Sequence, residues 1–144
     1  MGNYKTIRDE VIDIVAAAQL SGASAFAEVT GTIKEQFSGY PAASIIPSEV
    51  TSEYLTVAEN TRQYGLSVNM HYGIASSDDW QTALDVMLDL SDVVMDALDS
   101  SIDLNATCDF LQAVPMTWEV MQTGQQMELV GTIKIVASKR VNVQ

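Results

Sequence analysis

The sequence predicts an α+β domain: a mostly antiparallel sheet of about four to six strands, with two main helices packed on one face. Two segments, Tyr64–Ile74 and Met127–Ala137, place apolar residues at every second position, which is typical of strands with one buried face. Residues 4–20 and 78–98 repeat apolar residues at three- and four-residue steps, as amphipathic helices do. With 144 residues, 47% of them hydrophobic, the chain can bury one core, so residues 1–144 are expected to form a single domain.

The first helix is predicted over residues 4–20 because its apolar residues form one stripe. The stripe consists of Ile7, Val11, Ile14, Val15 and Ala18. Asn3 is a suitable N-cap, and Ser21-Gly22 is expected to end the helix.

Several strands are predicted between residues 26 and 74, joined by short turns. Short strands are expected at 26–30, 42–47 and 54–57, with a loop at 31–40 and turns at 48–53 and 59–63. Pro47 either stops its strand or marks a sheet edge, because proline cannot donate a ladder hydrogen bond. The long strand from Tyr64 follows, and tight turns between these strands favour antiparallel pairing.

The second helix, predicted over residues 78–98, has an apolar face and an acidic face. Either Ser76 or Ser77 can cap its N-terminus. The apolar face comprises Trp80, Ala83, Leu84, Met87, Leu90, Val94 and Leu98. The opposite face, here called the acidic stripe, comprises Asp85, Asp89, Asp92, Asp96 and Asp99. At 100° per residue these five carboxylates fall within a sector of about 80°.

Two closing strands are predicted after an irregular segment at 99–109. The first covers residues 111–121, where Pro115 indicates an edge strand or a bulge. The second covers 127–137, and Lys139-Arg140 then opens a short basic tail.

The composition bounds the kind of partner that the chain can bind. Its net charge of −12 disfavours tight binding of nucleic acid, which relies on Lys and Arg contacts to phosphate. The sequence has no apolar run long enough to cross a membrane and no signal-peptide core near Met1. The single cysteine, Cys108, cannot form an internal disulfide and is expected to be a buried thiol, so production in the cytoplasm is expected.

The sequence offers little that suggests catalysis. His71, the only histidine, lies on the polar side of the long strand with no nucleophile motif beside it, so it is expected to be a surface or interface residue. No phosphate-binding glycine loop or zinc-protease motif occurs. The acidic stripe is straight, whereas a cation site needs oxygen ligands that converge. We therefore expect no enzyme, no cofactor and no metal site.

One run of residues resembles a known family. The segment YPAASIIPSE from Tyr40 to Glu49 is followed by Tyr54-Leu55-Thr56, Glu59-Asn60-Thr61-Arg62 and the long alternating strand. With the acidic helix and the closing strands, this order resembles the tail-terminator (tail-completion) proteins of long-tailed bacteriophages over residues 4–138. The matching motifs are short and include no catalytic signature.

The resemblance implies a structural virion protein at the head-proximal end of the tail, made in the host cytoplasm. Such proteins form a ring, usually hexameric, that caps the tail tube, stops its growth and joins the head connector. DNA passes through the lumen without specific binding, and no membrane is involved. On this interpretation Tyr40, Glu59, Asn60 and Arg62 are candidate contacts with other subunits or the tube, and the acidic stripe is a candidate lumen lining that could equally face outward.

Two other functions fit the same sequence. The chain could be a head–tail connector or neck protein of the same virion region. It could instead be a small cytoplasmic ligand-binding domain or enzyme that uses aspartates and His71.

Overall fold

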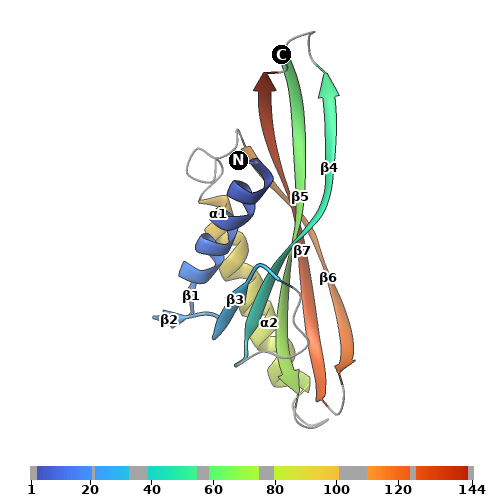
Figure 1. Ribbon diagram of the computed structural model, residues 1–144. Helices are drawn as coiled ribbons and strands as arrows, with labels where there is room; N and C mark the ends of the chain where they lie inside the picture. Colours follow the sequence, from blue (N-terminus) through green and yellow to red (C-terminus); the bar gives the residue numbers. More distant parts are fainter. Residues whose placement is uncertain are drawn as a thin grey trace.

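The computed structural model describes residues 3–20, 22–32, 39–54, 59–74, 80–100, 110–123 and 126–142. It confirms the predicted α+β class: helices α1 (Asn3–Ala17) and α2 (Trp80–Asp99) lie on one face of a five-stranded sheet (Figure 1). The predicted caps Ser76 and Ser77, and Cys108, lie outside the described residues.

The main sheet has the strand order β3-β4-β5-β7-β6. Its strands are β3 (Glu28–Thr30), β4 (Ala42–Tyr54), β5 (Glu59–Ile74), β6 (Phe110–Thr123) and β7 (Gln126–Asn142). The short β3 pairs parallel with β4, and every other pairing is antiparallel. A separate two-stranded sheet joins β1 (Gln19–Leu20) to β2 (Ala23–Ser24).

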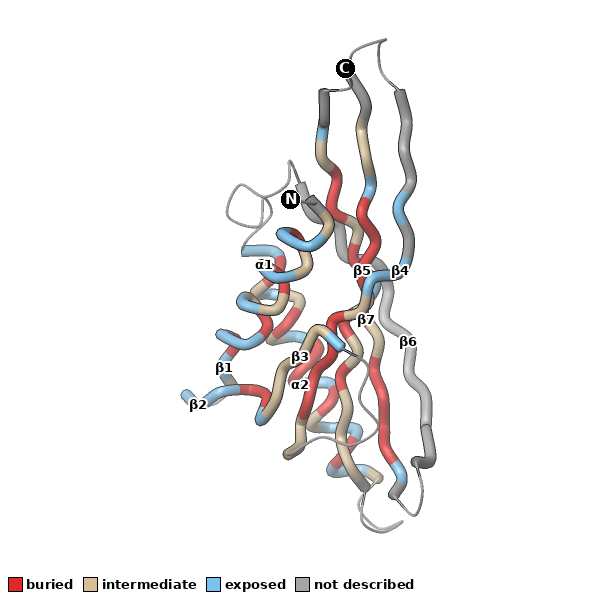
Figure 2. Tube along the Cα trace, viewed as in Figure 1, coloured by how far each residue is buried: buried red, intermediate tan, exposed pale blue. Residues whose placement is uncertain are grey.

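The core lies between the helices and the near face of the sheet, as the buried segments in Figure 2 show. The predicted alternation puts Leu66, Val68 and Met70 of β5 at 0% exposure. Tyr4 attaches the start of α1 to the sheet: its hydroxyl donates to the Gly65 carbonyl, and its ring lies 5.1 Å from that of Tyr64. Apolar periodicity alone therefore located the core.

The predicted turns at 48–53 and 59–63 are wrong, because both segments belong to long strands. β4 pairs with β5 from Ala42↔His71 to Tyr54↔Asn60, with a register shift between Pro47 and Val50. The predicted basic tail is also wrong: Lys139 and Arg140 lie in β7, opposite Arg62 and Thr61.

The first helix ends three residues before its predicted end. Ala18 donates its N–H to Val15 at 3.2 Å and its carbonyl accepts from Ala25, so the chain leaves the helix there for the β1–β2 hairpin. Gly22 in that hairpin has φ +82°, a conformation that favours glycine. The predicted stripe nevertheless stays buried at Ile7, Val11 and Val15.

Both predictions from proline are confirmed. β6 is an edge strand, and its pairing with β7 shifts between Val114 and Thr117, around Pro115. Beyond its three-residue pairing with β3, β4 is the opposite edge, and Pro47 begins its bulge. A proline and a bulge both discourage further strands from pairing with an edge.

The sheet is much longer than the helices that cover it. β5 and β7 pair along their whole length, from Glu59↔Asn142 to Ile74↔Met127. At 3.3 Å per residue β5 is about 53 Å long, whereas the longer helix, α2, spans about 30 Å. The ends of β4, β5 and β7 therefore continue past the start of α1 (Figure 1). We call this part, residues 50–54, 59–63 and 138–142, the ribbon.

Candidate functional site: two surfaces and a buried polar cluster

The ribbon holds three of the predicted contact residues. Glu59, Asn60 and Arg62 lie in β5, where they pair with β7, and Asn60 and Arg62 also face β4. Arg62 lies opposite Lys139, and antiparallel partners share a face of the sheet. The charged segment therefore does extend away from the core, although as paired strand and not as a turn. Its contact with other subunits stays a prediction.

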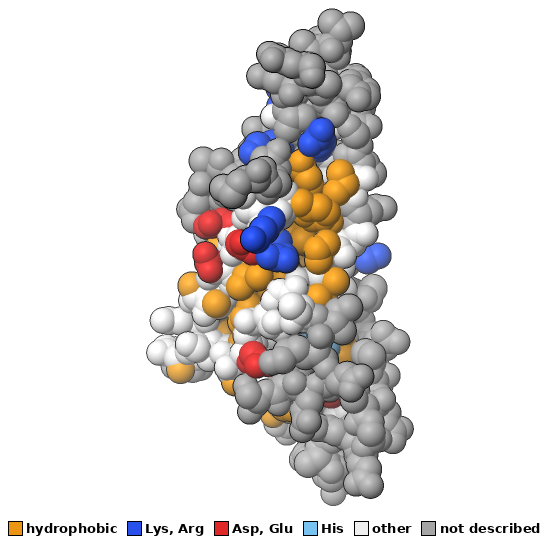
Figure 3. Space-filling view, viewed as in Figure 1, with side chains coloured by type: hydrophobic (Ala, Val, Ile, Leu, Met, Phe, Trp, Pro, Cys, Tyr) orange, Lys and Arg blue, Asp and Glu red, His pale blue; other side chains and the backbone are white. Residues whose placement is uncertain are grey.

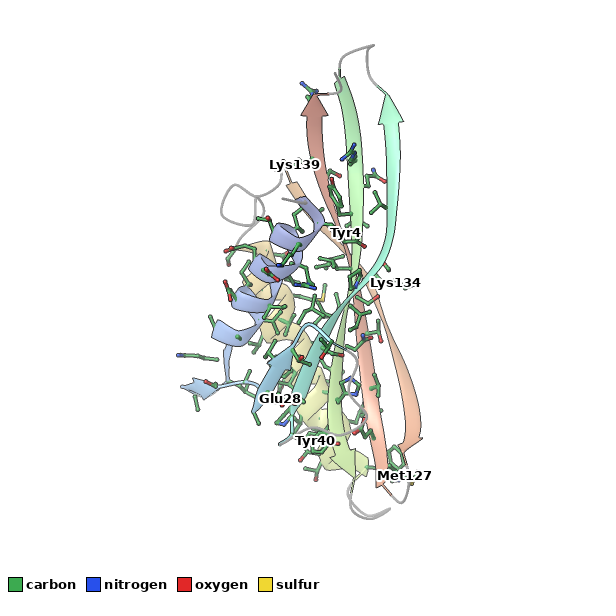
Figure 4. All side chains as sticks on the ribbon, viewed as in Figure 1. Tyr4, Glu28, Tyr40, Met127, Lys134 and Lys139 are labelled. Carbon is green, nitrogen blue, oxygen red and sulfur yellow. The ribbon has the colours of Figure 1, made fainter. Side chains whose placement is uncertain are left out.

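The fourth predicted contact residue, Tyr40, takes part in a hydrogen-bonded cluster on the far face of the sheet. Its hydroxyl donates to Glu128 Oε2, Glu128 Oε1 lies 3.1 Å from His71 Nδ1, and Ser44 Oγ lies 3.4 Å from His71 Nε2. The cluster joins β4, β5 and β7 near one end of the sheet, where Figure 4 labels Tyr40 and Met127. We call Tyr40, Ser44, His71 and Glu128 the polar cluster.

Burial and hydrogen bonding fix the roles of these side chains. The Glu128 side chain is 6% exposed and the His71 side chain 14%. An ionised carboxylate only accepts hydrogen bonds, so Nδ1 of His71 must donate to it. Nε2 accepts from the Ser44 hydroxyl when the imidazole is neutral, and donates to it when the imidazole is protonated. His71, predicted as a surface or interface residue, is half-buried on the far face of the sheet, and its contact with another subunit stays a prediction.

The polar cluster contains the Ser–His–carboxylate order of a nucleophilic triad, but its setting does not suit catalysis. Ser44 is 4% exposed and lies within β4, paired with Thr30 of β3 and Asn69 of β5. A nucleophile needs an approach path for substrate and backbone donors for the developing oxyanion. The backbone of β4 is engaged in the sheet, so we interpret the cluster as a clamp between the Tyr40 segment and the sheet.

Tyr40 has a perturbed acidity that reflects this clamp. Burial, followed by the hydrogen bond to Glu128 and its charge, raises the pKa of Tyr40 from 10.0 to about 12. The cis peptide bond between Tyr40 and Pro41 precedes β4, and the Pro41 carbonyl accepts from Ala27 N–H at 2.7 Å. The segment is thus attached to the fold through both its backbone and its phenol.

We expect alkaline pH to weaken the fold through Tyr40. The folded protein holds this proton more tightly than the unfolded chain, so the contribution of Tyr40 to the free energy of unfolding is constant below pH 10 and is lost as the pH rises from 10 towards 12. Urea unfolding of the wild type and Tyr40→Phe at intervals across this range measures the effect. The difference between the two proteins should shrink as the pH rises, and a constant difference would contradict the assignment.

The acidic stripe lies on the solvent side of α2, where all five aspartates are exposed. Beside it on the same helix, Leu84 and Leu88 are 44% and 48% exposed. The prediction that Leu84 is a core residue is wrong, because Leu84 lies at the margin of the apolar sector and Ser91 is buried in its place. Among the described side chains, no group of three or more His, Cys, Asp or Glu residues is placed to hold a metal ion.

Two surface hollows lie on different sides of the helix layer. One of about 530 Å³ is lined by Trp80, Gln81, Leu84, Asp85 and Leu129. The other, of about 490 Å³, lies between α1 and β4 and is lined by Tyr4, Lys5, Arg8 and Pro47. The first is acidic and apolar, and the second is basic and apolar.

Neither models of known protein families nor curated protein sequences give a match to this chain. Within the described ranges, neither helix combines the length and apolar character that a membrane crossing requires.

Proposed function

We propose that the protein is a structural component that assembles with copies of itself into a ring, and that this ring caps the tail tube of a bacteriophage. It stops tube growth and forms the joint to the head connector, with DNA passing through its lumen. The observation that carries the proposal is the ribbon: a sheet that continues far beyond its own helix layer.

The ribbon is only partly covered within one molecule. Val50 lies opposite Tyr64 on the helix side of the sheet, yet it is 46% exposed because the helices end there. Chain ordering costs roughly 1–2 kcal/mol of backbone entropy per residue, which burial normally offsets. Contact with another subunit would supply the missing burial, and this supports an assembling protein.

The resemblance described for residues 4–138 supports the particular assembly. The element order α1, strands, α2, closing strands agrees with the order from which the resemblance was drawn. The net charge of −12 suits a ring through which DNA must slide without adhering. The head–tail connector is the neighbouring alternative.

Native mass spectrometry, with and without assembled tail tubes, tests the proposal. We expect a ring-sized species, and in its presence tubes should stop elongating, with the ring visible at tube ends by electron microscopy. A protein that stays monomeric with tubes present would contradict it. A ring that binds the head connector but ignores tubes would assign the alternative function.

A further inference from the structure

The two surface hollows carry opposite charge, and each includes apolar residues in its lining. On α2, Leu84 and Leu88 form an apolar patch next to Asp85 of the acidic stripe, and Asp89 continues the row of carboxylates one turn beyond Asp85. At 100° per residue, Leu88 and Leu84 lie about 60° and 100° around the helix from Asp85. One side of α2 therefore presents apolar and carboxylate groups together, next to the hollow that Trp80 and Leu129 complete.

The hollow between α1 and β4 has the complementary chemistry. Lys5 and Arg8 lie beside Tyr4 and Pro47, and the half-exposed Val50 follows Pro47 in β4, at the start of the ribbon. Figure 3 shows this face, where Lys and Arg atoms border a hydrophobic area. Arg8 already binds Asp9 at 2.9 Å, but a guanidinium has further N–H donors.

The few basic residues lie outside the acidic helix α2. Every basic residue except Lys34, which lies outside the described part, belongs to α1, β5 or β7: Lys5, Arg8, Arg62, Lys134, Lys139 and Arg140. No basic residue occurs in α2, which carries the whole acidic stripe. A chain of net charge −12 repels its copies unless its few basic groups are brought to its acidic ones.

We propose that a patch on α2 of one copy docks on the α1–β4 hollow of the next copy. This α2 patch comprises Leu84 and Leu88 with Asp85 and Asp89. The docking rests on the proposed ring and identifies the surfaces that would close it. The two surfaces belong to different elements, so the contact is head-to-tail, and repeated head-to-tail contacts form a ring when their rotation closes. The acidic stripe then faces a neighbouring subunit and not the lumen.

Charge reversal on either surface tests the proposal. Asp85→Lys/Asp89→Lys makes both surfaces basic, and Lys5→Glu/Arg8→Glu makes both acidic. We expect each variant alone to lose the ring species at a concentration where the wild type forms it. In a 1:1 mixture every contact between unlike copies is again acid to base, so native mass spectrometry should show rings with equal numbers of the two variants.

The controls separate this proposal from the ring itself. Asp13→Lys changes an exposed charge on α1 outside the hollow and should keep the ring. Circular dichroism verifies that each variant folds. The formation of mixed rings would be independent evidence that both variants are folded. Rings from both variants alone, or no rings from the mixture, would overturn the docking while the wild-type ring stands. A wild type that never forms a ring would remove the proposed function as well.

Discussion

Replacing Leu90 by alanine is expected to lower the free energy of unfolding by about 2–5 kcal/mol, the usual cost of a cavity at a fully buried leucine. Leu90 is 0% exposed and belongs to the cluster that α1, α2 and the sheet share. Helix α2 packs against both α1 and the sheet, so the core in which Leu90 is buried is built from both layers.

The same helix provides a matched control. Leu84→Ala removes the same atoms from a side chain that is 44% exposed and leaves no enclosed cavity, so the loss should be smaller, about 1 kcal/mol. Urea unfolding of the two variants, at concentrations where the protein is monomeric, compares them directly. Equal losses would show that α2 packs differently from the arrangement described here. If Leu84 contributes to docking, its loss should appear in ring formation instead.

The core was predictable from the sequence because each helix and strand that forms it has one buried face and one solvent-exposed face. Leu66, Val68 and Met70 alternate with smaller or polar residues, and Ile7, Val11 and Val15 repeat with the helical period. Both patterns arise from burial on a single face. The fold class and the two helices followed from them.

The ribbon was not predicted, because its residues lack the one-sided periodicity that identified the core. Residues 59–63 are polar and charged, so they carry no alternation that would distinguish a strand from a turn. A strand with neither face packed in the core has no periodic signal to read. What holds these residues in a strand is their backbone pairing with β4 and β7, which depends on residues far away in the sequence.

The polar cluster could not be predicted from the sequence either, because its side chains meet only when three strands pair in the observed register. His71 is 57 residues from Glu128, and Tyr40 is 88 residues from it. On the far face Glu128 lies diagonally from His71, whose direct partner is Val130. The only local signals were a glutamate in a strand and a histidine on its polar side, and both are common on exposed sheets.

Glu128 is expected to be the most sensitive polar residue of the fold. It accepts from Tyr40 and from His71 while its residue is only 5% exposed. Glu128→Ala would leave the phenol and the imidazole without this acceptor in a largely dry site, at a cost of about 1–3 kcal/mol for each unsatisfied group. We therefore expect a loss of about 3 kcal/mol in the free energy of unfolding at neutral pH.

A double-mutant cycle separates the clamp from general damage. Tyr40→Phe keeps the ring and removes one donor, and Glu128→Gln keeps the shape and removes the charge. Because the two side chains bond directly, their losses should be non-additive, with a coupling energy of about 1–2 kcal/mol. Tyr4→Phe with Glu128→Gln is the matched control: Tyr4 bonds Gly65, six residues along β5 from His71 and outside the polar cluster, so that pair should be additive. Additivity in both cycles would mean that the hydroxyl of Tyr40 does not hold Glu128 in solution.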